Sequence, residues 1–217
     1  SKDYQSGPLS FEYFNEGDKI ITNCGYGRKI SKKTRLISKF TSAQSTLCLD
    51  NTSVVKFKRN SLINSIYGST IDSSFKIFDT DRSEDKKNII ISATHNAYLK
   101  RFGYLHKRTI KFSKKDNEIT GTDSLIKKNG TEANVNYSIR FHIYPGIDAI
   151  QTVSGKNILL QISKKKSLVF LTNNDDVEIE KSLFLGGNKV LNNQCIVIYG
   201  NTKSQDRNIE WTLKKAS

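Results

Sequence analysis

The sequence predicts an all-β domain. An antiparallel β-sandwich of about a dozen strands fits it best, with a barrel as the alternative. Three observations support this. Short segments are apolar or alternate apolar with polar residues, turn residues separate them at intervals of roughly eight to twelve residues, and no long stretch has a helical period. Because no linker or fixed repeat divides the chain, we expect a single domain over residues 1–217.

Strand patterns recur along most of the chain. In order, they lie at residues 18–24, 46–57, 88–95, 108–113, 117–123, 138–144, 157–163, 167–172, 177–185, 194–200 and 208–214. The last, NIEWTLK, is the clearest, because Ile209, Trp211 and Leu213 alternate with polar residues, as on a strand with one buried face. Between strands, SKKDNE, KKNGTEAN, VSGKN and TNNDD carry the Asn, Asp, Gly and Ser residues typical of hairpin loops.

The chain is strongly basic, with 35 Lys and Arg against 21 Asp and Glu, a net charge of +14. Such a field favours anionic partners: acidic polysaccharide, nucleic acid or a membrane surface. A bias toward Lys, Asn and Ile in the source genome is an alternative explanation of the total. It explains the clustering less well, because Lys19 to Lys39 holds seven cations and no acid, and Lys86 to Lys115 holds nine and none.

The cysteines, the hydropathy and the N-terminus bear on whether the chain has disulfides, a membrane span or a signal peptide. Cys24, Cys48 and Cys195 are odd in number, form no metal-type pair and sit in strand-like settings, so we expect small buried side chains rather than disulfides. No apolar run is long enough to cross a bilayer, so no membrane insertion is expected. No signal peptide is visible, and the start without Met suggests a piece of a longer protein.

The stretch HNAYLKRFGYLHKRTIKFS, residues 95–113, combines histidine, tyrosine and cations. It is an active site, an anion-binding face or an ordinary hairpin, in which His95 and His106 would meet across the strands. The segment RTIKF alternates, so Arg108, Thr109 and Lys111 are expected on a polar side, with Ile110 and Phe112 on the other. We expect a structural hairpin whose polar side faces a cleft.

The residue types in this stretch suit a lyase that acts on acidic sugars. Such an enzyme removes a proton beside a uronate carboxylate, so it needs a cation or donor for that carboxylate, a base and an acid. Aromatics among cations also suit nucleic acid, but no RNP-like or OB-like signature accompanies them, so no nucleic-acid partner is expected. The common nucleotide-binding, serine-hydrolase and zincin motifs are absent from the sequence.

Several short motifs, collinear over nearly the whole chain, carry a family resemblance. They are SGPLSFEYFNEGDKIITNCG at 6–25, TSAQSTLCLDNTS at 41–53, HNAYLKRFGYLHKRTIKFS at 95–113, GTDSL at 121–125, RFHIYPG at 140–146 and SLFLGGNK at 182–189. In this order they resemble the C-terminal β-sandwich domain of the heparinase II/III-like polysaccharide lyases. The resemblance implies an N-terminal α/α-toroid domain, absent from this chain, with the catalytic cleft between the two domains. It also implies an acidic polysaccharide partner and a place in the bacterial periplasm or cell envelope.

The chain departs from this family at the position that matters most. Where relatives carry Ala-His, it has Ala43-Gln44, and a glutamine cannot transfer a proton at useful pH. Gln5 is a second candidate replacement of a family histidine, while His95 and Tyr98 match a His-x-x-Tyr motif. In some relatives a histidine near His95 helps bind a structural zinc, for which Asp50 and His142 are conceivable partners here.

These considerations give the following candidates: for catalysis Gln44, His95 and Tyr98; for substrate binding Arg101, His106, Lys107, Arg108, Arg140 and His142; and for zinc His95 and Asp50. We expect one wall of a lyase cleft, inactive as an isolated chain. The alternative is a non-catalytic domain that binds anionic glycans after its lyase chemistry has decayed. For Gln44 itself, a buried polar role is an equal possibility.

Overall fold

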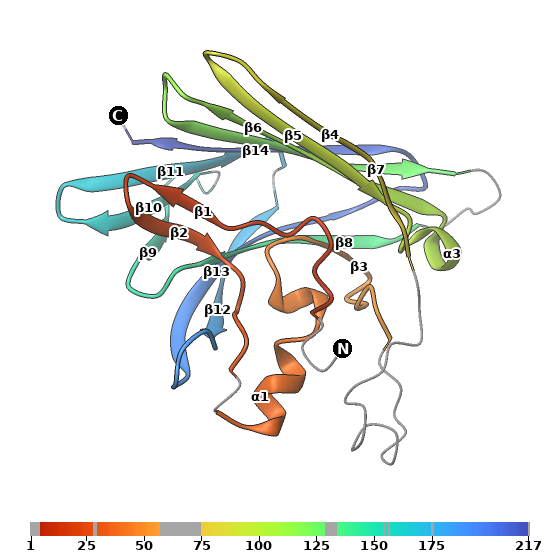
Figure 1. The fold of residues 1–217 in the computed structure, drawn as a ribbon, viewed down its shortest axis with the longest axis horizontal. Helices are drawn as coiled ribbons and strands as arrows, with labels where there is room; N and C mark the ends of the chain where they lie inside the picture. The colour runs from red at the N-terminus through yellow and green to blue at the C-terminus, as the bar shows by residue number, and fades with distance from the viewer. Residues whose placement is uncertain are drawn as a thin grey trace.

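Two antiparallel sheets pack face to face and form a sandwich, which confirms the predicted fold class (Figure 1). A computed structural model describes residues 5–27, 30–56, 75–128, 134–153, 155, 157–174 and 176–216. No helix in these ranges is long and apolar enough to cross a bilayer.

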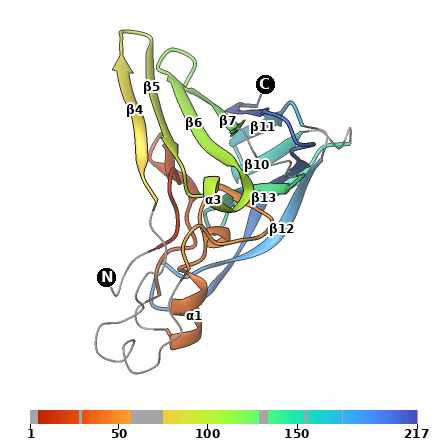
Figure 2. The same ribbon diagram turned by 90° about the vertical axis from the view of Figure 1, so that its right-hand side faces the viewer.

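The larger sheet has eight strands in the order β4-β5-β6-β7-β14-β11-β10-β9. Their bounds are β4 Ile77–Glu84, β5 Asn88–His95, β6 Tyr104–Ser113, β7 Glu118–Lys127, β14 Arg207–Lys215, β11 Lys166–Thr172, β10 Ile158–Ser163 and β9 Asp148–Gln151. Figure 2 shows the upper ends of β4, β5 and β6 projecting beyond the body of the sandwich. This sheet therefore has one covered part and one part that extends into solvent.

The smaller sheet has six strands. Five follow the order β1-β2-β8-β13-β12, and β3 pairs with β8 off this path. Their bounds are β1 Tyr13–Asn15, β2 Asp18–Thr22, β3 Leu47–Leu49, β8 Asn136–Ile143, β12 Val177–Phe184 and β13 Leu191–Asn201. The helices are α1 Lys32–Ile37, η1 Thr41–Ala43 and α3 Leu99–Phe102.

Aromatic side chains fill the space between the sheets. Trp211 is 1% exposed, and its ring lies 4.9 Å from that of Phe141 and 5.4 Å from that of Phe11. Ile209 and Leu213 are buried on the same face of β14, as the alternation in NIEWTLK predicts. The three cysteines are free and buried, which confirms their expected role as small core residues.

The structure corrects the expected elements in a few places. β1, β4, β9 and the helices have no counterpart among the expected segments, and within residues 46–56 only Leu47–Leu49 forms a strand. That strand ends because Asp50 and Asn51 adopt positive φ angles of 48° and 49°. β4 escaped detection because it is an edge strand, exposed along most of its length, so it needs no apolar alternation.

Replacing Gly121 tests the packing around Trp211. A β-carbon at residue 121 would collide with the Trp211 indole. Because overpacking a rigid core is costly, we expect Gly121→Ala to lower the free energy of unfolding by about 1–3 kcal/mol in urea denaturation. Gly187→Ala is the matched control, since nothing lies within 4 Å of its would-be β-carbon. Equal stability of the two variants would contradict this packing.

Candidate functional site

The candidate site is built around residues 41–47, called the Gln44 segment, which runs from η1 into the first residue of β3. The Gln44 side chain is 1% exposed, and its Nε2 donates to the Ser38 carbonyl at 2.8 Å. Gly7 packs on top of it, because a β-carbon there would come within 2.7 Å of Gln44 Cγ. Gln44 therefore occupies the buried polar role, and a ligand would reach it only if the residues around Gly7 moved.

Side chains far away in sequence hold the carbonyl groups of the Gln44 segment. His142 Nε2 donates to Ser42 O at 3.0 Å, Arg108 Nη1 to Ser45 O at 2.8 Å, and Tyr98 Oη to Leu47 O at 2.9 Å. The backbone N–H of Arg140 adds a bond to Thr46 O at 3.1 Å. Four residues that the sequence singles out thus converge on the segment that carries a fifth, Gln44.

Arg108 also forms a buried ion pair with Asp123, which is 0% exposed. Its Nε and Nη2 atoms donate to the two carboxylate oxygens at 2.8 and 3.0 Å, and Trp211 Nε1 donates to one of them at 3.0 Å. Burial alone would raise the pKa of the Asp123 carboxyl, but the Arg108 charge and the hydrogen bonds from Arg108 and His106 hold this pKa well below its usual value. Asp123 is therefore a permanent buried anion.

Two histidines continue this network in a defined order. His106 Nε2 lies 2.7 Å from Asp123 Oδ1 and donates to it, so Nδ1 of a neutral His106 accepts from His95 Nε2 at 3.0 Å. His95 Nδ1 in turn accepts from the Ala97 N–H at 3.2 Å. Burial lowers the pKa of both rings, so both are neutral. The expected meeting of His95 and His106 across a hairpin is confirmed, since they are cross-strand partners in β5 and β6.

His142 occupies a separate position on the other sheet. Its Nδ1 lies 2.9 Å from Ser182 Oγ and accepts from it, because Nε2 donates to Ser42 O. Burial lowers the pKa of His142 to about 4, and burial raises the pKa of the neighbouring Cys24 thiol to about 11. The sulfur lies 3.5 Å from His142 Nδ1 but stays protonated at neutral pH, so it is not an activated nucleophile.

Comparison with known proteins shows which family the chain belongs to. The family model described as heparinase II/III-like, C-terminal, matches residues 1–212. The chain belongs to this family. Heparan sulfate lyase HepC from Pedobacter heparinus is a similar solved structure, with a TM-score of 0.76 and 17% identity, over 98% of this chain and 31% of HepC. Heparinase III has a TM-score of 0.72 and 12% identity, over 98% of this chain and 30% of its own.

These structural likenesses, at such low identity, show the fold alone. This heparinase II/III-like chain spans about a third of the length of those enzymes. No curated protein sequence matches it.

The described residues of the heparinase II/III-like domain do not fit a structural zinc. No three His, Cys, Asp or Glu side chains among them converge as metal ligands. Both ring nitrogens of His95 are engaged, with His106 and with Ala97, so no lone pair is left for a metal. Asp50, its expected partner, lies instead 4.0 Å from Arg101 Nη2 at the surface.

The more exposed candidates lie on different surfaces. Lys107 is on the outer face of β6, opposite its neighbours His106 and Arg108, whereas Arg140 is on the outer face of β8 in the other sheet. Arg101, in α3, is half exposed and stacks 4.8 Å from the Phe102 ring. The structure does not bring these three side chains to one anion, so they form no single binding surface.

The expected faces of β6 require one correction. Arg108 shares the inner face with Ile110 and Phe112, instead of pointing outward with Lys111, because alternate residues of a strand lie on the same face. Its charge can be buried there because Asp123 neutralises it. Sequence reasoning missed Asp123 itself. The signal was present in the sequence. Asp123 is in step with Ile119, Gly121 and Leu125 at every second position, so it shares the buried face of β7, where a carboxylate needs a cationic partner.

The neutral buried histidines predict how stability depends on pH. His95, His106 and His142 have lowered folded-state pKa values, so the unfolded chain binds more protons once pH falls toward the unfolded value near 6.5. The contribution of these neutral histidines to the free energy of unfolding is fully present above that pH. It is lost as the pH falls below it, by up to about 1.4 kcal/mol per pH unit for each histidine. Urea unfolding at a series of pH values measures this slope.

His142→Gln provides the comparison, because glutamine can still donate to Ser42 O but does not titrate. Between pH 6.5 and 5 we expect its slope to be smaller by up to one proton. An identical slope in the two proteins would show that His142 is not neutral in the fold.

Proposed function

We propose that this chain binds acidic polysaccharide and forms one wall of a substrate cleft in a longer heparinase II/III-like protein, opposite an N-terminal helical toroid. The observation that supports it best is the fixed position of the Gln44 segment. Three side-chain donors, from the N-cap of α3, from β6 and from β8, hold three of its backbone carbonyls. Such rigidity suits a segment that supports a ligand-binding surface at a constant position, with Ser42 as the one residue of the segment that is itself exposed.

The chain does not itself supply the proton transfers of β-elimination. Gln44 stands at the position where relatives carry a histidine, and it cannot act as acid or base. His95 and His106 are buried, with both ring nitrogens engaged, and burial raises the pKa of the buried Tyr98 phenol well above its usual value. Catalysis by His95 or Tyr98 stays a prediction that requires these side chains to become accessible. We therefore propose that the isolated chain has no lyase activity.

A second candidate is a non-catalytic glycan-binding domain whose lyase chemistry has been lost. The burial of Gln44 under Gly7 favours it, because a side chain kept for contact with substrate would be expected to reach the surface. Under either proposal the partner is an acidic polysaccharide and no nucleic acid. A place in the periplasm or cell envelope is proposed from the family alone.

Chromatography and an activity assay test this proposal together. We expect the purified chain to be retained on heparin-agarose at low salt, to elute with increasing salt, and to pass through a neutral-glycan column. We expect no unsaturated uronate product from heparan sulfate. Release of that product would contradict the proposed inactivity, and equal behaviour on the two columns would contradict acidic-polysaccharide binding.

Arg101→Ala with Lys107→Ala tests the more exposed predicted contacts in the same assay. Earlier elution of this double variant would support them as substrate contacts. Unchanged elution would remove Arg101 and Lys107 from the binding surface.

A further inference from the structure

Helix α1 lies at one end of the molecule (Figure 1). It exposes cationic and apolar side chains to solvent. None of its residues is buried, and Leu36, Ile37 and Phe40, just beyond its end, are 48%, 39% and 37% exposed. The α1 surface consists of the exposed side chains Lys32, Lys33, Arg35, Leu36, Ile37 and Phe40. Single exposed apolar residues are ordinary, but three large ones close together beside lysines mark a candidate contact surface.

The helix is short, but its first turn is capped and its C-terminal end is bonded to other segments of the domain. Ser31 caps the first turn of the helix. Its Oγ accepts from the Thr34 N–H at 3.1 Å, and Thr34 Oγ1 accepts from the Ser31 N–H. At the other end, Ser38 O accepts from Gln44 Nε2, and the Lys39 carbonyl accepts from the Ser6 N–H at 2.9 Å. The α1 surface is therefore held directly against the Gln44 segment.

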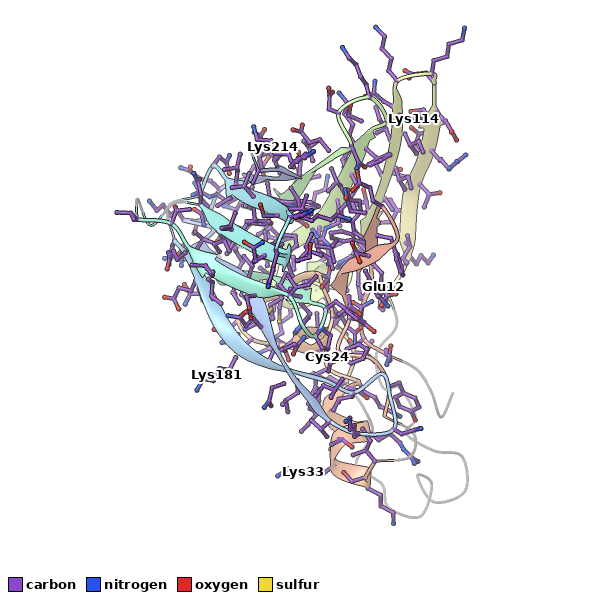
Figure 3. The ribbon with its side chains drawn as sticks, turned by 90° about the vertical axis from the view of Figure 1, so that its left-hand side faces the viewer. Glu12, Cys24, Lys33, Lys114, Lys181 and Lys214 are labelled. Atoms are coloured by element: carbon purple, nitrogen blue, oxygen red, sulfur yellow. The ribbon has the colours of Figure 1, made fainter. Side chains whose placement is uncertain are left out.

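Two of the charges on this surface, those of Lys32 and Lys33, have no ion-pair partner in the part of the chain that the structure describes. The sequence contains no Asp or Glu from residue 19 to residue 49. Figure 3 shows Lys33 at one end of the molecule and Lys114, from the other acid-free run, near the opposite end. The two runs therefore form separate surfaces.

The fold pairs some cations of the second run with acids. Lys114 Nζ lies 2.7 Å from Glu84 Oε1, and Arg108 is paired with the buried Asp123. Lys87, Lys111 and Lys115 line a hollow at the hairpin tip together with Asp116 and Glu118. Nearby acids thus compensate part of the charge of the second run, whereas Lys32 and Lys33 have no ion-pair partner among the described residues.

We propose that the α1 surface is the contact of this domain with acidic polysaccharide. The ammonium groups of Lys32 and Lys33 would meet sulfate or carboxylate groups. Leu36, Ile37 and Phe40 would cover the C–H faces of the sugar rings, where dispersion and loss of apolar surface favour contact. This inference rests on the proposed function and names the surface that would bind the polysaccharide. It moves the binding face away from the 95–113 hairpin, whose histidines and Arg108 are buried.

An anionic lipid surface also attracts cations beside apolar side chains. The structure favours the polysaccharide for two reasons. The helix has six residues, too few for a broad membrane-facing stripe, and its Ser38 end is bonded to Gln44, in the segment proposed above as part of the substrate-cleft wall. Lipid binding is therefore kept as an outcome of the test.

The test compares two pairs of lysine substitutions with equal change in charge. Lys32→Ser with Lys33→Ser alters the α1 surface, and Lys86→Ser with Lys87→Ser alters the exposed tip of the β4–β5 hairpin. Each pair lowers the net charge from +14 to +12. For a heparin decasaccharide in 0.1 M salt, we expect the α1 pair to weaken binding about tenfold and the tip pair less than about twofold.

A third variant examines the apolar half of the surface. Leu36→Ser with Phe40→Ser leaves the charge unchanged, so we expect weaker decasaccharide binding with the same dependence on salt. Circular dichroism of each variant, matched to the parent, shows that the fold is retained. Binding unaffected by this variant would contradict the apolar contact to the sugar rings.

The outcomes separate this inference from the proposed function. Failure of the parent chain to bind the decasaccharide contradicts both. Binding by the parent that the two lysine pairs weaken equally contradicts the α1 surface and leaves the proposed function intact. Binding to phosphatidylglycerol vesicles that is lost with the α1 pair, together with unchanged decasaccharide binding, assigns the surface to lipid and overturns the inference.

Discussion

One buried charge, the Asp123 carboxylate, constrains much of this molecule. A carboxylate between two sheets is costly unless it is paired and fully hydrogen-bonded, and here Arg108, His106 and Trp211 supply those bonds. Once Arg108 is fixed in this way, its remaining donor atom Nη1 reaches the carbonyls of Leu9 and Ser45. The pair thus links the centre of the larger sheet to the two loop segments that surround Gln44.

This constraint explains why residues typical of an active site are found in the interior. A tyrosine, two histidines and an arginine in one short stretch match the requirements of acidic-sugar chemistry, yet their polar atoms are used to position backbone carbonyls and to satisfy one another. What they support is the Gln44 segment and, through Ser38, helix α1. In this account the interior supplies rigidity, and the contact with polysaccharide is left to exposed lysines and apolar side chains.

The sequence was sufficient for the fold and for part of the site. Period-two alternation, as in residues 208–214, identified the central strands, and the spacing of His95 and His106 anticipated their pairing. Sequence patterns failed where contacts between distant segments determine which way a side chain points or where a helix lies. A lysine-rich or arginine-bearing strand is normally assigned to solvent. Two signals indicate instead that Arg108 turns inward: it is in step with the apolar Ile110 and Phe112 of β6, and Asp123 occupies a buried position among apolar residues of β7. Helix α1 is too short for a periodic signal, and its fixed place depends on a glutamine beyond its end.

Amide hydrogen exchange in an Arg108→Lys variant tests the central claim most directly. Lysine keeps the charge beside Asp123 but cannot also hold the Leu9 and Ser45 carbonyls. The account predicts faster exchange, by tenfold or more, at the Cys24 and Arg140 amides, which donate to Ala43 O and Thr46 O. Amides between β10 and β11, far from this pair, should keep their protection. Unchanged exchange at the Cys24 and Arg140 amides, or equal acceleration throughout the domain, would contradict this account.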